Sequence, residues 1–221
     1  MGYIEKINLD RFPLWEKAKK KGLLSHVSME LTERCNNNCI HCYINLPTNN
    51  EKAQKKEITL EEIKEIADEA VKVGCLSWHL TGGEPLLCED FSDIYLYLKR
   101  KGIRVILSTN ATLINSEIIS LFKKYPLENL EVTIYGLSQK TYEAITRNPG
   151  SFDAFRQGIN LLRDNHIPFT LKAAVLAQNF HEIEKMRDFS QSFTGEHLGI
   201  VIQLNLRSRF NGGSKKDLIS L

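Results

Sequence analysis

The sequence is organised around residues 29–43, which read Met29-Glu-Leu-Thr-Glu-Arg-Cys35-Asn-Asn-Asn-Cys39-Ile-His-Cys42-Tyr43. Three of the chain's five cysteines fall within eight residues here, with the spacing Cys-x3-Cys-x2-Cys. Apolar and polar residues alternate from 27 to 32, which is typical of a strand, and the asparagine tract between the first two thiols favours a turn. Three soft thiolates on one short loop at a strand's end indicate an iron–sulfur cluster.

The three thiols lack a fourth cysteine nearby, so one iron of a cubane cluster would have no protein ligand. A catalytic zinc site keeps a comparable open position, and an open iron can bind a small molecule and act on it. Two alternatives are a structural zinc ion, with a histidine as fourth ligand, and unreactive thiols. Zinc modules usually carry two ligand pairs a dozen or more residues apart, and this sequence has no second pair. The spacing therefore favours a cluster.

The cysteine spacing, with the aromatic His41 before the third cysteine, resembles the signature of the radical S-adenosylmethionine (radical SAM) superfamily. Residues 81–85, Thr-Gly-Gly-Glu-Pro, resemble that family's Gly-Gly-Glu-Pro motif. The resemblance implies a [4Fe-4S] cluster held by Cys35, Cys39 and Cys42, with S-adenosylmethionine on the open iron. It further implies an enzyme that cleaves this cofactor reductively to a 5′-deoxyadenosyl radical, which abstracts hydrogen from a substrate. A flavodoxin or ferredoxin would be the electron donor.

The same resemblance assigns a first group of residues to the cofactor. It places the stretch Thr81, Gly82, Gly83 and Glu84 at the amino group of the methionine moiety. Glycines let the backbone approach a ligand, and strand-end carbonyls and a carboxylate accept hydrogen bonds from an ammonium group. His41 is expected to pack near the adenine.

A second group of expected contacts comes from later strands. Ser108 and Asn110 are expected to meet the carboxylate or ribose of S-adenosylmethionine. Residues 133–136, Thr-Ile-Tyr-Gly, stand where many relatives have Ser-x-Asp-Gly, so Thr133 keeps a hydroxyl while Tyr135 replaces the acid. Arg147 lies where relatives place an arginine that pairs with the methionine carboxylate, although a surface arginine at a helix end explains it as well.

Six strands alternate with helices along the chain. We predict strands over residues 26–32, 77–81, 104–109, 130–135, 169–176 and 200–206, with helix starts at Thr59, Asp90 and Asn115. This alternation implies an α/β fold with a parallel sheet, and six units are too few for an eight-unit barrel. The resemblance implies the same architecture, a partial (β/α)6 TIM-like barrel. One face of each strand is polar and is expected to line a lumen that holds a polar ligand and water.

The predicted domain organisation has three parts. Residues 1–25 form an arm with a short helix, residues 26–210 form the core domain, and residues 211–221 form a tail. Residues 48–56 are polar and are expected to be a surface loop. The chain looks most similar to relatives with a C-terminal auxiliary-cluster (SPASM-type) domain, which modify peptides or proteins or act in cofactor biosynthesis. No cysteine follows Cys88, so a second cluster domain is not expected within this sequence.

Composition is that of an ordinary globular protein, with 221 residues, 42% hydrophobic and 25% charged. A net charge of +2 gives no reason to expect nucleic acid as a partner. No apolar run approaches the roughly 20 residues of a membrane span, and the clustered thiols suit the reducing cytoplasm. A peptide or protein is the expected substrate. The alternatives are a cluster-binding scaffold without turnover and a zinc-stabilised interaction module.

Overall fold

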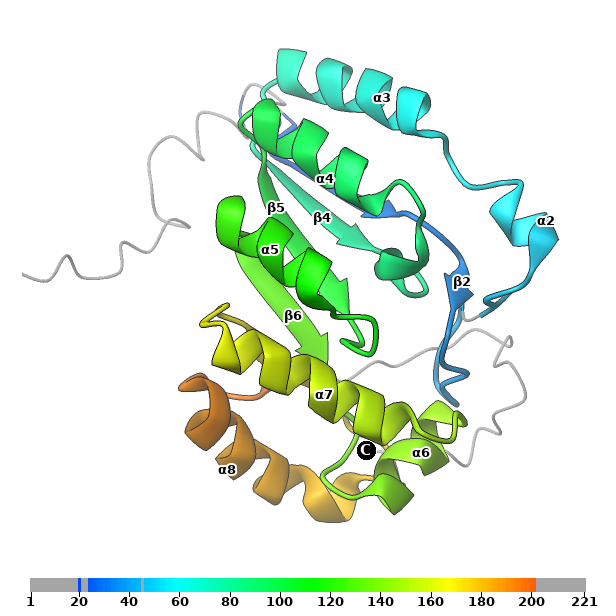
Figure 1. Ribbon diagram of the computed structural model, residues 1–221, viewed down its shortest axis with the longest axis vertical. Coiled ribbons are helices and arrows are strands. Elements are labelled where there is room, and N and C mark those ends of the chain that lie inside the picture. The colour runs from blue at the N-terminus through cyan, green and yellow to red at the C-terminus, as the bar shows by residue number, and fades with distance from the viewer. Residues whose placement is uncertain (1–19, 21–23, 45, 202–221) are drawn as a thin grey trace, which may run out of the picture.

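A computed structural model describes residues 20, 24–44 and 46–201 of the chain. Its main sheet has six parallel strands in the order β1-β4-β5-β6-β7-β8 (Figure 1). Their bounds are β1 (His26–Glu30), β4 (Ser77–Thr81), β5 (Arg104–Thr109), β6 (Asn129–Thr133), β7 (Thr170–Ala174) and β8 (Gly199–Val201). Each strand pairs with the next strand of this sheet along the chain, so the predicted parallel α/β fold is confirmed.

From the top of Figure 1 to the bottom, α3, α4, α5, α7 and α8 follow one another along the outside of the sheet, and α6 lies beside α7. Their bounds are α3 (Leu60–Lys72), α4 (Phe91–Arg100), α5 (Ser116–Lys124), α6 (Gln139–Thr146), α7 (Ser151–Asp164) and α8 (Ile183–Thr194). Short 3-10 helices, η2 (Pro85–Leu87) and η3 (Phe180–Glu182), lie in two of the loops.

The helix starts follow from local sequence. Thr59 and Glu62 form a reciprocal capping box at α3, and the Asn115 side chain accepts hydrogen bonds at the start of α5. Asp90 occupies the N-cap of α4 as predicted, although its side chain makes no capping hydrogen bond. Local sequence therefore marks where these helices start.

The two faces of the sheet differ as the alternation predicts. Trp78, Leu80 and Leu107 are fully buried on the face that carries the helices. The neighbouring residues His79, Ser108 and others in the same strands are only partly buried and belong to the opposite face. The core therefore lies between sheet and helices, and the polar face remains available for a ligand.

Two predictions about local structure need correction. Residues 48–56 are not simply a loop, because Asn50 caps a short helix, α2 (Glu51–Gln54), which buries Ala53. The cysteine stretch also forms a two-stranded parallel pair, β2 (Arg34–Cys35) with β3 (Leu46–Pro47), that sequence patterning did not indicate. Nearly all of the predicted arm, the tail and most of the sixth predicted strand lie outside the described residues.

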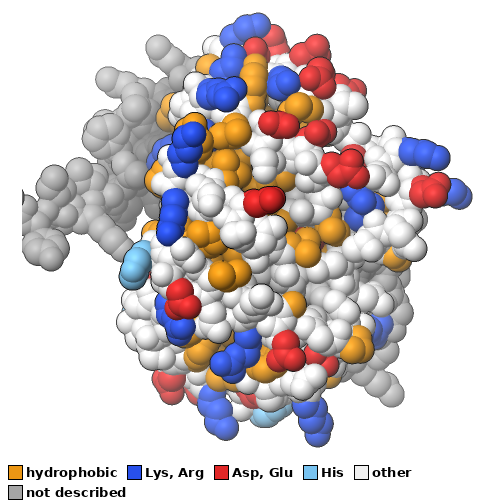
Figure 2. Space-filling model, viewed as in Figure 1, with side chains coloured by type: hydrophobic (Ala, Val, Ile, Leu, Met, Phe, Trp, Pro, Cys, Tyr) orange, Lys and Arg blue, Asp and Glu red, His pale blue; other side chains and the backbone are white. Residues whose placement is uncertain are grey.

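The outer surface carries both signs of charge. On the face drawn in Figure 2, Lys and Arg side chains alternate with Asp and Glu, and hydrophobic groups are scattered between them. Within the described part of the chain, no helix has the length and apolar character required to cross a membrane.

Candidate cluster and cofactor site

The loop after β1 and the C-terminal ends of β4, β5 and β6 enclose a cavity of about 150 Å³. Open parallel α/β sheets bind ligands at this edge. The cavity is lined by Cys35, Asn37, Cys39, Cys42, Thr81, Gly82, Gly83, Ser108, Thr109, Asn110, Thr133 and Tyr135. The predicted cysteines, the Gly-Gly turn and the polar residues of three strand ends therefore meet in one place, although up to 98 positions separate them in sequence (133 − 35 = 98).

The cysteines lie in an environment that suits a cationic metal centre. Cys39 is buried, and Cys35 and Cys42 are half-buried. Burial raises the pKa of the Cys35 and Cys39 thiols to about 12, because a thiolate there loses its hydration. Coordination to a metal deprotonates a thiol outright and removes this penalty.

The arrangement of the thiols differs from that of a single-ion site. Among the described residues, no three His, Cys, Asp or Glu side chains are grouped closely enough to hold one metal ion. Each thiolate of an iron–sulfur cluster binds a different iron, so cluster ligands need not converge on one point.

Hydrogen-bond donors lie around the Cys35 sulfur. The backbone N–H of Asn37 donates to Cys35 Sγ at 3.4 Å, and Asn110 Nδ2 approaches the same sulfur at 3.9 Å. Tyr135 lines the cavity together with Cys39. Donors aimed at cysteine sulfur stabilise negative charge there, which is the usual environment of cluster ligands.

Asn37 provides a further indication that the cavity accepts a ligand. Its side chain lines the cavity and only 3% of the residue is exposed. Its Oδ1 accepts a hydrogen bond from Asn148 Nδ2 at 3.1 Å, so its own Nδ2 points away from Asn148. That Nδ2 is buried without a hydrogen-bond partner among the described residues, at a cost of about 1–3 kcal/mol. An acceptor in the cavity, such as a cluster sulfur or a cofactor carboxylate, would satisfy it.

The cysteine loop is fixed by the end of α6. The backbone N–H groups of Asn38 and Ile40 donate to carbonyls of the last turn of α6 at 2.8 and 3.0 Å. Just beyond this helix, Asn148 Nδ2 donates to the Asn36 carbonyl at 2.9 Å. In Figure 1 the segment that follows β2 accordingly runs to α6. The cysteine loop is therefore held by the end of α6 and by Asn148 as well as by the strand that precedes it.

A second set of contacts joins the cysteine loop to the end of β5. Asn110 Nδ2 donates to Asn36 Oδ1 at 2.9 Å, and Asn36 Nδ2 donates to Thr112 Oγ1 at 2.7 Å. The sequence prediction treated the asparagine tract as a turn and did not assign these roles. Neither Asn36 nor Asn148 belongs to a motif that would have revealed its partner, because each partner is distant in sequence.

The two glycines of the second motif are required by close backbone packing. A Cβ on Gly82, which has φ of +133°, would lie 2.5 Å from the Thr32 carbonyl oxygen. A Cβ on Gly83 would lie 2.2 Å from the Arg34 carbonyl oxygen. We expected the glycines to admit a ligand; the structure shows that they first allow the turn to dock on the backbone that leads into Cys35. Both glycines still line the cavity.

Glu84 follows the two glycines in the same motif. Its side chain is fully buried and does not line the cavity. It accepts hydrogen bonds from Thr109 Oγ1 at 2.7 Å and from the Asn110 backbone N–H at 2.8 Å. Burial raises the pKa of this carboxyl group to about 7, against the lowering effect of these hydrogen bonds. The carboxyl group thus joins the Gly-Gly turn to the end of β5, and its contact with the ammonium group of the cofactor stays a prediction.

Two other predicted residues also lie outside the cavity lining. His41 packs edge-on against Tyr135, with ring centroids 5.3 Å apart, and burial lowers the pKa of its imidazole to about 4. Arg147 is exposed and ends α6 in a left-handed conformation, with φ of 51°. The roles assigned to these two residues by resemblance stay predictions.

A row of polar side chains adjoins the cavity on the polar face of the sheet. His79 Nε2 lies 2.7 Å from Ser108 Oγ, which donates to Glu131 Oε2 at 3.0 Å. Glu131 Oε1 also forms an ion pair with Lys172 Nζ at 2.5 Å. Burial lowers the pKa of His79, which favours its neutral form. The row crosses β4, β5, β6 and β7, as expected for a polar lumen, and Ser108 belongs to both the row and the cavity.

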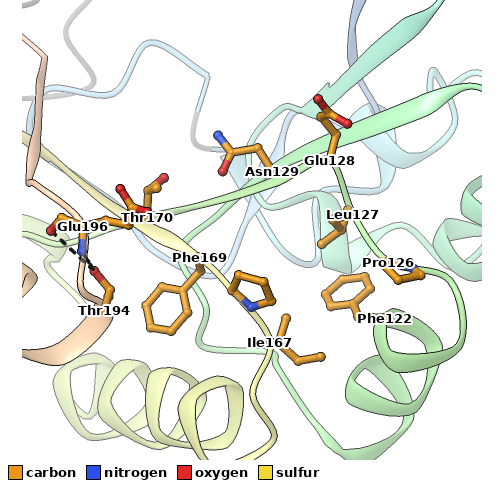
Figure 3. Close-up of a pocket in the computed structure, with 11 residues that line it drawn as sticks. Phe122, Pro126, Leu127, Glu128, Asn129, Ile167, Phe169, Thr170, Thr194 and Glu196 are labelled. Carbon is orange, nitrogen blue, oxygen red and sulfur yellow. Dashed lines mark hydrogen bonds between the residues drawn. The ribbon is translucent and has the colours of Figure 1, made fainter. Parts of the chain in front are cut away.

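A second cavity, of about 290 Å³, opens at the opposite end of the sheet, where β6 and β7 begin. Figure 3 shows Phe122, Leu127, Ile167 and Phe169 around it, with Glu196 hydrogen-bonded to Thr194 at its side. No cysteine and none of the residues predicted for the site lines this cavity.

A family model and several known proteins match this chain. The sequence model of the Radical SAM superfamily matches residues 29–190, a span that contains both motifs and all the cavity residues. The chain therefore belongs to the radical SAM superfamily, a family of enzymes, as its two motifs predicted.

The relatives have varied names. The AdoMet-dependent heme synthase of Methanosarcina barkeri (strain Fusaro) is 34% identical over 159 residues, which cover 72% of this chain and 45% of that protein. A probable GTP 3′,8-cyclase of Methanocella arvoryzae is 31% identical, covering 90% of this chain and 62% of that protein. The bacteriocin biosynthesis protein AlbA of Bacillus subtilis is 28% identical, covering 73% and 35%. The chain thus spans less than two thirds of each relative.

Solved structures share the fold. The structure of anSMEcpe with bound AdoMet gives a TM-score of 0.71 at 16% identity, covering 88% of this chain and 55% of that one. Streptococcus suis SuiB bound to its precursor peptide SuiA gives 0.69 at 16% identity, covering 90% and 47%. These likenesses confirm the predicted α/β architecture of a partial, TIM-like barrel.

Proposed function

We propose that this chain holds a [4Fe-4S] cluster on Cys35, Cys39 and Cys42 and binds S-adenosylmethionine beside it. The convergence of the three thiols with the Gly-Gly turn in one cavity carries the proposal. When bound, such a cluster supplies the single electron that cleaves the cofactor to methionine and a 5′-deoxyadenosyl radical, which abstracts hydrogen from a substrate. A low-potential donor such as a flavodoxin or ferredoxin is the proposed source of that electron, in the reducing cytoplasm.

The residues that line the cavity have complementary roles in this proposal. Thr81, Gly82 and Gly83 present strand-end backbone to the amino group of the methionine moiety. Ser108, Asn110 and Thr133 offer hydroxyl and amide groups to its carboxylate and to the ribose. Asn37 donates its unpartnered amide hydrogen to an acceptor in the same cavity. Such preorganised donors need no rearrangement when the ligand enters.

Three of the residues that the family resemblance assigns to the cofactor are proposed to act on it less directly. Glu84 positions the Gly-Gly turn and the Asn110 backbone through the hydrogen bonds that it accepts from Thr109 and Asn110. His41 supports Tyr135 by ring packing and is proposed to reach the adenine from there. Arg147 is proposed to approach the methionine carboxylate from the end of α6, where it lies exposed.

We propose a peptide or protein as the substrate. The lumen presents the row of His79, Ser108, Glu131 and Lys172, which offers both donors and acceptors to a chain of amide groups. A largely apolar macrocycle would have fewer groups to pair with them, and unpaired buried polar groups are costly. Relatives named for peptide products, AlbA and the PqqA peptide cyclase of Bradyrhizobium diazoefficiens, support this choice, whereas the heme synthase relatives give the competing substrate class.

The cofactor chemistry is tested by turnover of S-adenosylmethionine. Protein reconstituted with iron and sulfide without oxygen, then reduced, should release 5′-deoxyadenosine measurable by mass spectrometry. A Cys39→Ala variant should lose at least about a hundredfold of this activity. The three cysteines hold the cluster together, so the loss of one has nearly the effect of losing all three. The control is Cys88→Ala, because Cys88 is half-buried but does not line the cavity. Product formation by Cys39→Ala at the wild-type rate would refute the assignment.

Metal analysis separates this proposal from its alternatives. The proposal requires iron and acid-labile sulfide in the purified protein. Zinc in place of iron would support an interaction module, and iron without 5′-deoxyadenosine would support a scaffold.

The substrate class has a separate test. A perdeuterated cell extract is divided into a macromolecular fraction and a small-molecule fraction, and each is added to the reduced enzyme. Deuterium should enter 5′-deoxyadenosine only with the macromolecular fraction. Incorporation from the small-molecule fraction alone would instead point to a small-molecule substrate such as a porphyrin.

A further inference from the structure

We propose that Lys172 binds the substrate by donating a hydrogen bond to an uncharged carbonyl oxygen, such as that of a peptide amide. This inference rests on the proposed function and deepens it. Glu131 and Gly199 act through Lys172 as positioning residues, because they fix where its ammonium group lies.

The first observation is the place of Lys172 in the sheet. Lys172 on β7 pairs in register with Thr133 on β6, and Thr133 lines the cavity that contains the three cysteines. Neighbouring strands of a sheet lie about 5 Å apart. A group that Lys172 binds on the polar face therefore lies beside the cofactor cavity, where the proposed reaction takes place.

The second observation is that the side chain of Lys172 is held in position. Its Nζ forms an ion pair with Glu131 Oε1 at 2.5 Å. A Cβ at Gly199 on β8 would lie 2.9 Å from Lys172 Cγ, so the aliphatic stem lies close over a position that carries no side chain. Ordering a lysine costs side-chain entropy, and these contacts meet that cost before a substrate binds.

The third observation is that Lys172 has donors left for a ligand. An ammonium group has three N–H donors. Within the described part of the chain, that of Lys172 is paired with Glu131 alone, and 38% of the lysine side chain is exposed. Glu131 is more enclosed, and it also accepts from Ser108 Oγ at 3.0 Å and from Asn129 Nδ2 at 3.2 Å. The ammonium group is therefore the member of this pair that can bind a further partner.

The charge of the pair selects between acceptors. Glu131 already neutralises Lys172, and a substrate carboxylate on the same ammonium group would lie close to the Glu131 carboxylate. Two carboxylates in one partly buried site repel each other. An amide carbonyl accepts the same hydrogen bond without that repulsion. The pair therefore favours an uncharged acceptor, which the backbone of a peptide supplies.

Arg104 offers a matched control. It forms an ion pair with Glu128 at 3.1 Å, and its side chain is 39% exposed, almost the same as that of Lys172. Arg104 and Ser108 are four residues apart on β5, so both belong to the polar face. Arg104 begins the strand, whereas Ser108 lines the cavity near its end. Arg104→Met thus removes a paired cation of equal exposure at the opposite end of the same face.

The experiment compares two readouts of the reconstituted, reduced, oxygen-free enzyme. Deuterium transfer from the perdeuterated macromolecular fraction into 5′-deoxyadenosine requires bound substrate, whereas cleavage without that fraction reports the cofactor site. Lys172→Met should lower transfer, relative to its own substrate-free cleavage, about ten- to hundredfold, the worth of one hydrogen bond from a charged donor. Lys172→Arg should restore most of the ratio, because arginine keeps the charge and the N–H donors. Arg104→Met should change the ratio by less than about twofold.

A second variant keeps the test decisive if Lys172→Met fails to fold. Gly199→Ala keeps every charge and adds a Cβ that displaces the lysine stem. It should lower the same ratio about three- to tenfold, because the ammonium group no longer lies where the substrate carbonyl needs it.

The charge of the acceptor has its own probe. Carbodiimide coupling with methylamine converts the carboxylates of the macromolecular fraction to neutral amides. Transfer from the amidated fraction should continue and should still fall in Lys172→Met. Loss of this transfer, or transfer that no longer depends on Lys172, would overturn the uncharged acceptor.

The remaining outcomes separate this inference from the proposed function. An unchanged ratio in Lys172→Met and Gly199→Ala, with normal transfer by the wild type, would overturn the inference alone. An equal loss of transfer and of substrate-free cleavage would also leave the ratio unchanged and would place Lys172 at the cofactor. A wild-type protein that forms no 5′-deoxyadenosine, or that takes deuterium only from the small-molecule fraction, would defeat the proposed function and this inference with it.

Discussion

The two ends of the sheet carry cavities of different kinds. At the C-terminal ends of the strands, thiols, amides and glycines from separate loops are joined by backbone and side-chain hydrogen bonds. At the N-terminal ends, the larger cavity is bordered by apolar side chains such as Phe122 and Ile167 (Figure 3). Hydrogen bonds between loops depend on atomic positions, whereas apolar packing tolerates adjustment. The difference indicates that equal substitutions should have unequal effects at the two ends.

The largest difference in stability and iron binding between the two ends of the sheet is expected when the size of a side chain is changed. Gly83→Ala would place a Cβ 2.2 Å from the Arg34 carbonyl oxygen, and neither backbone segment can move without displacing Cys35. We expect a loss of at least about 4 kcal/mol in the free energy of unfolding, together with loss of iron binding. Chemical denaturation and iron analysis measure the two effects.

The control for Gly83→Ala lies at the other end of the sheet. Leu127→Ala enlarges the N-terminal cavity and should cost about 2 kcal/mol while leaving iron content unchanged. If Gly83→Ala bound iron normally and unfolded like the wild type, the close packing of the turn against residues 32–34 would be disproved.

A medium effect is expected from the buried carboxyl of Glu84. Glu84→Gln replaces an oxygen that accepts from Thr109 or Asn110 with an amide donor, which should lower the free energy of unfolding by about 1–3 kcal/mol. The matched control is Glu89→Gln, because Glu89 is exposed. Denaturation of both variants at pH 6 would show whether the buried position is responsible.

Glu84 should also leave a signature in the pH dependence of stability. Burial raises the pKa of its carboxyl from an ordinary 4.5 to about 7, so the folded state holds the proton more tightly than the unfolded state. Its contribution to stability is therefore complete below about pH 4.5 and is lost as pH rises through about 7. The stability of Glu84→Gln should lack this decline. An identical pH profile in both proteins would contradict the assigned pKa.

The smallest contrast is expected from single amide side chains. Asn148→Ala removes the donors to the Asn36 carbonyl and Asn37 Oδ1, and should cost about 1 kcal/mol and accelerate iron loss to a chelator severalfold. Asn165→Ala also removes a side-chain donor to a backbone carbonyl, together with an acceptor for Lys123 Nζ, two residues before Ile167 of the N-terminal cavity. It should cost a similar amount without changing the rate of iron release. Equal rates in both variants would mean that Asn148 does not hold the cysteine loop.

The fold was largely predictable because its signals are local. Alternation on each strand separated Trp78 and Leu80 from His79, and Thr59 and Asn115 marked helix starts by their own capping chemistry. The site was predictable only in part. Cys35, Cys39 and Cys42 were found by spacing. Asn37 was predicted only as part of a turn and Asn148 was not singled out, because the two side chains that bond each other lie more than a hundred positions apart in sequence.

Periodicity and short-range spacing are properties of neighbouring residues, so the parallel α/β architecture, the three clustered thiols and the Gly-Gly turn could be predicted from the chain alone. The burial of Glu84 and the positions of Asn37 and Tyr135 at the cavity became evident only in the folded molecule. These positions depend on burial and on hydrogen bonds between loops that are distant in sequence.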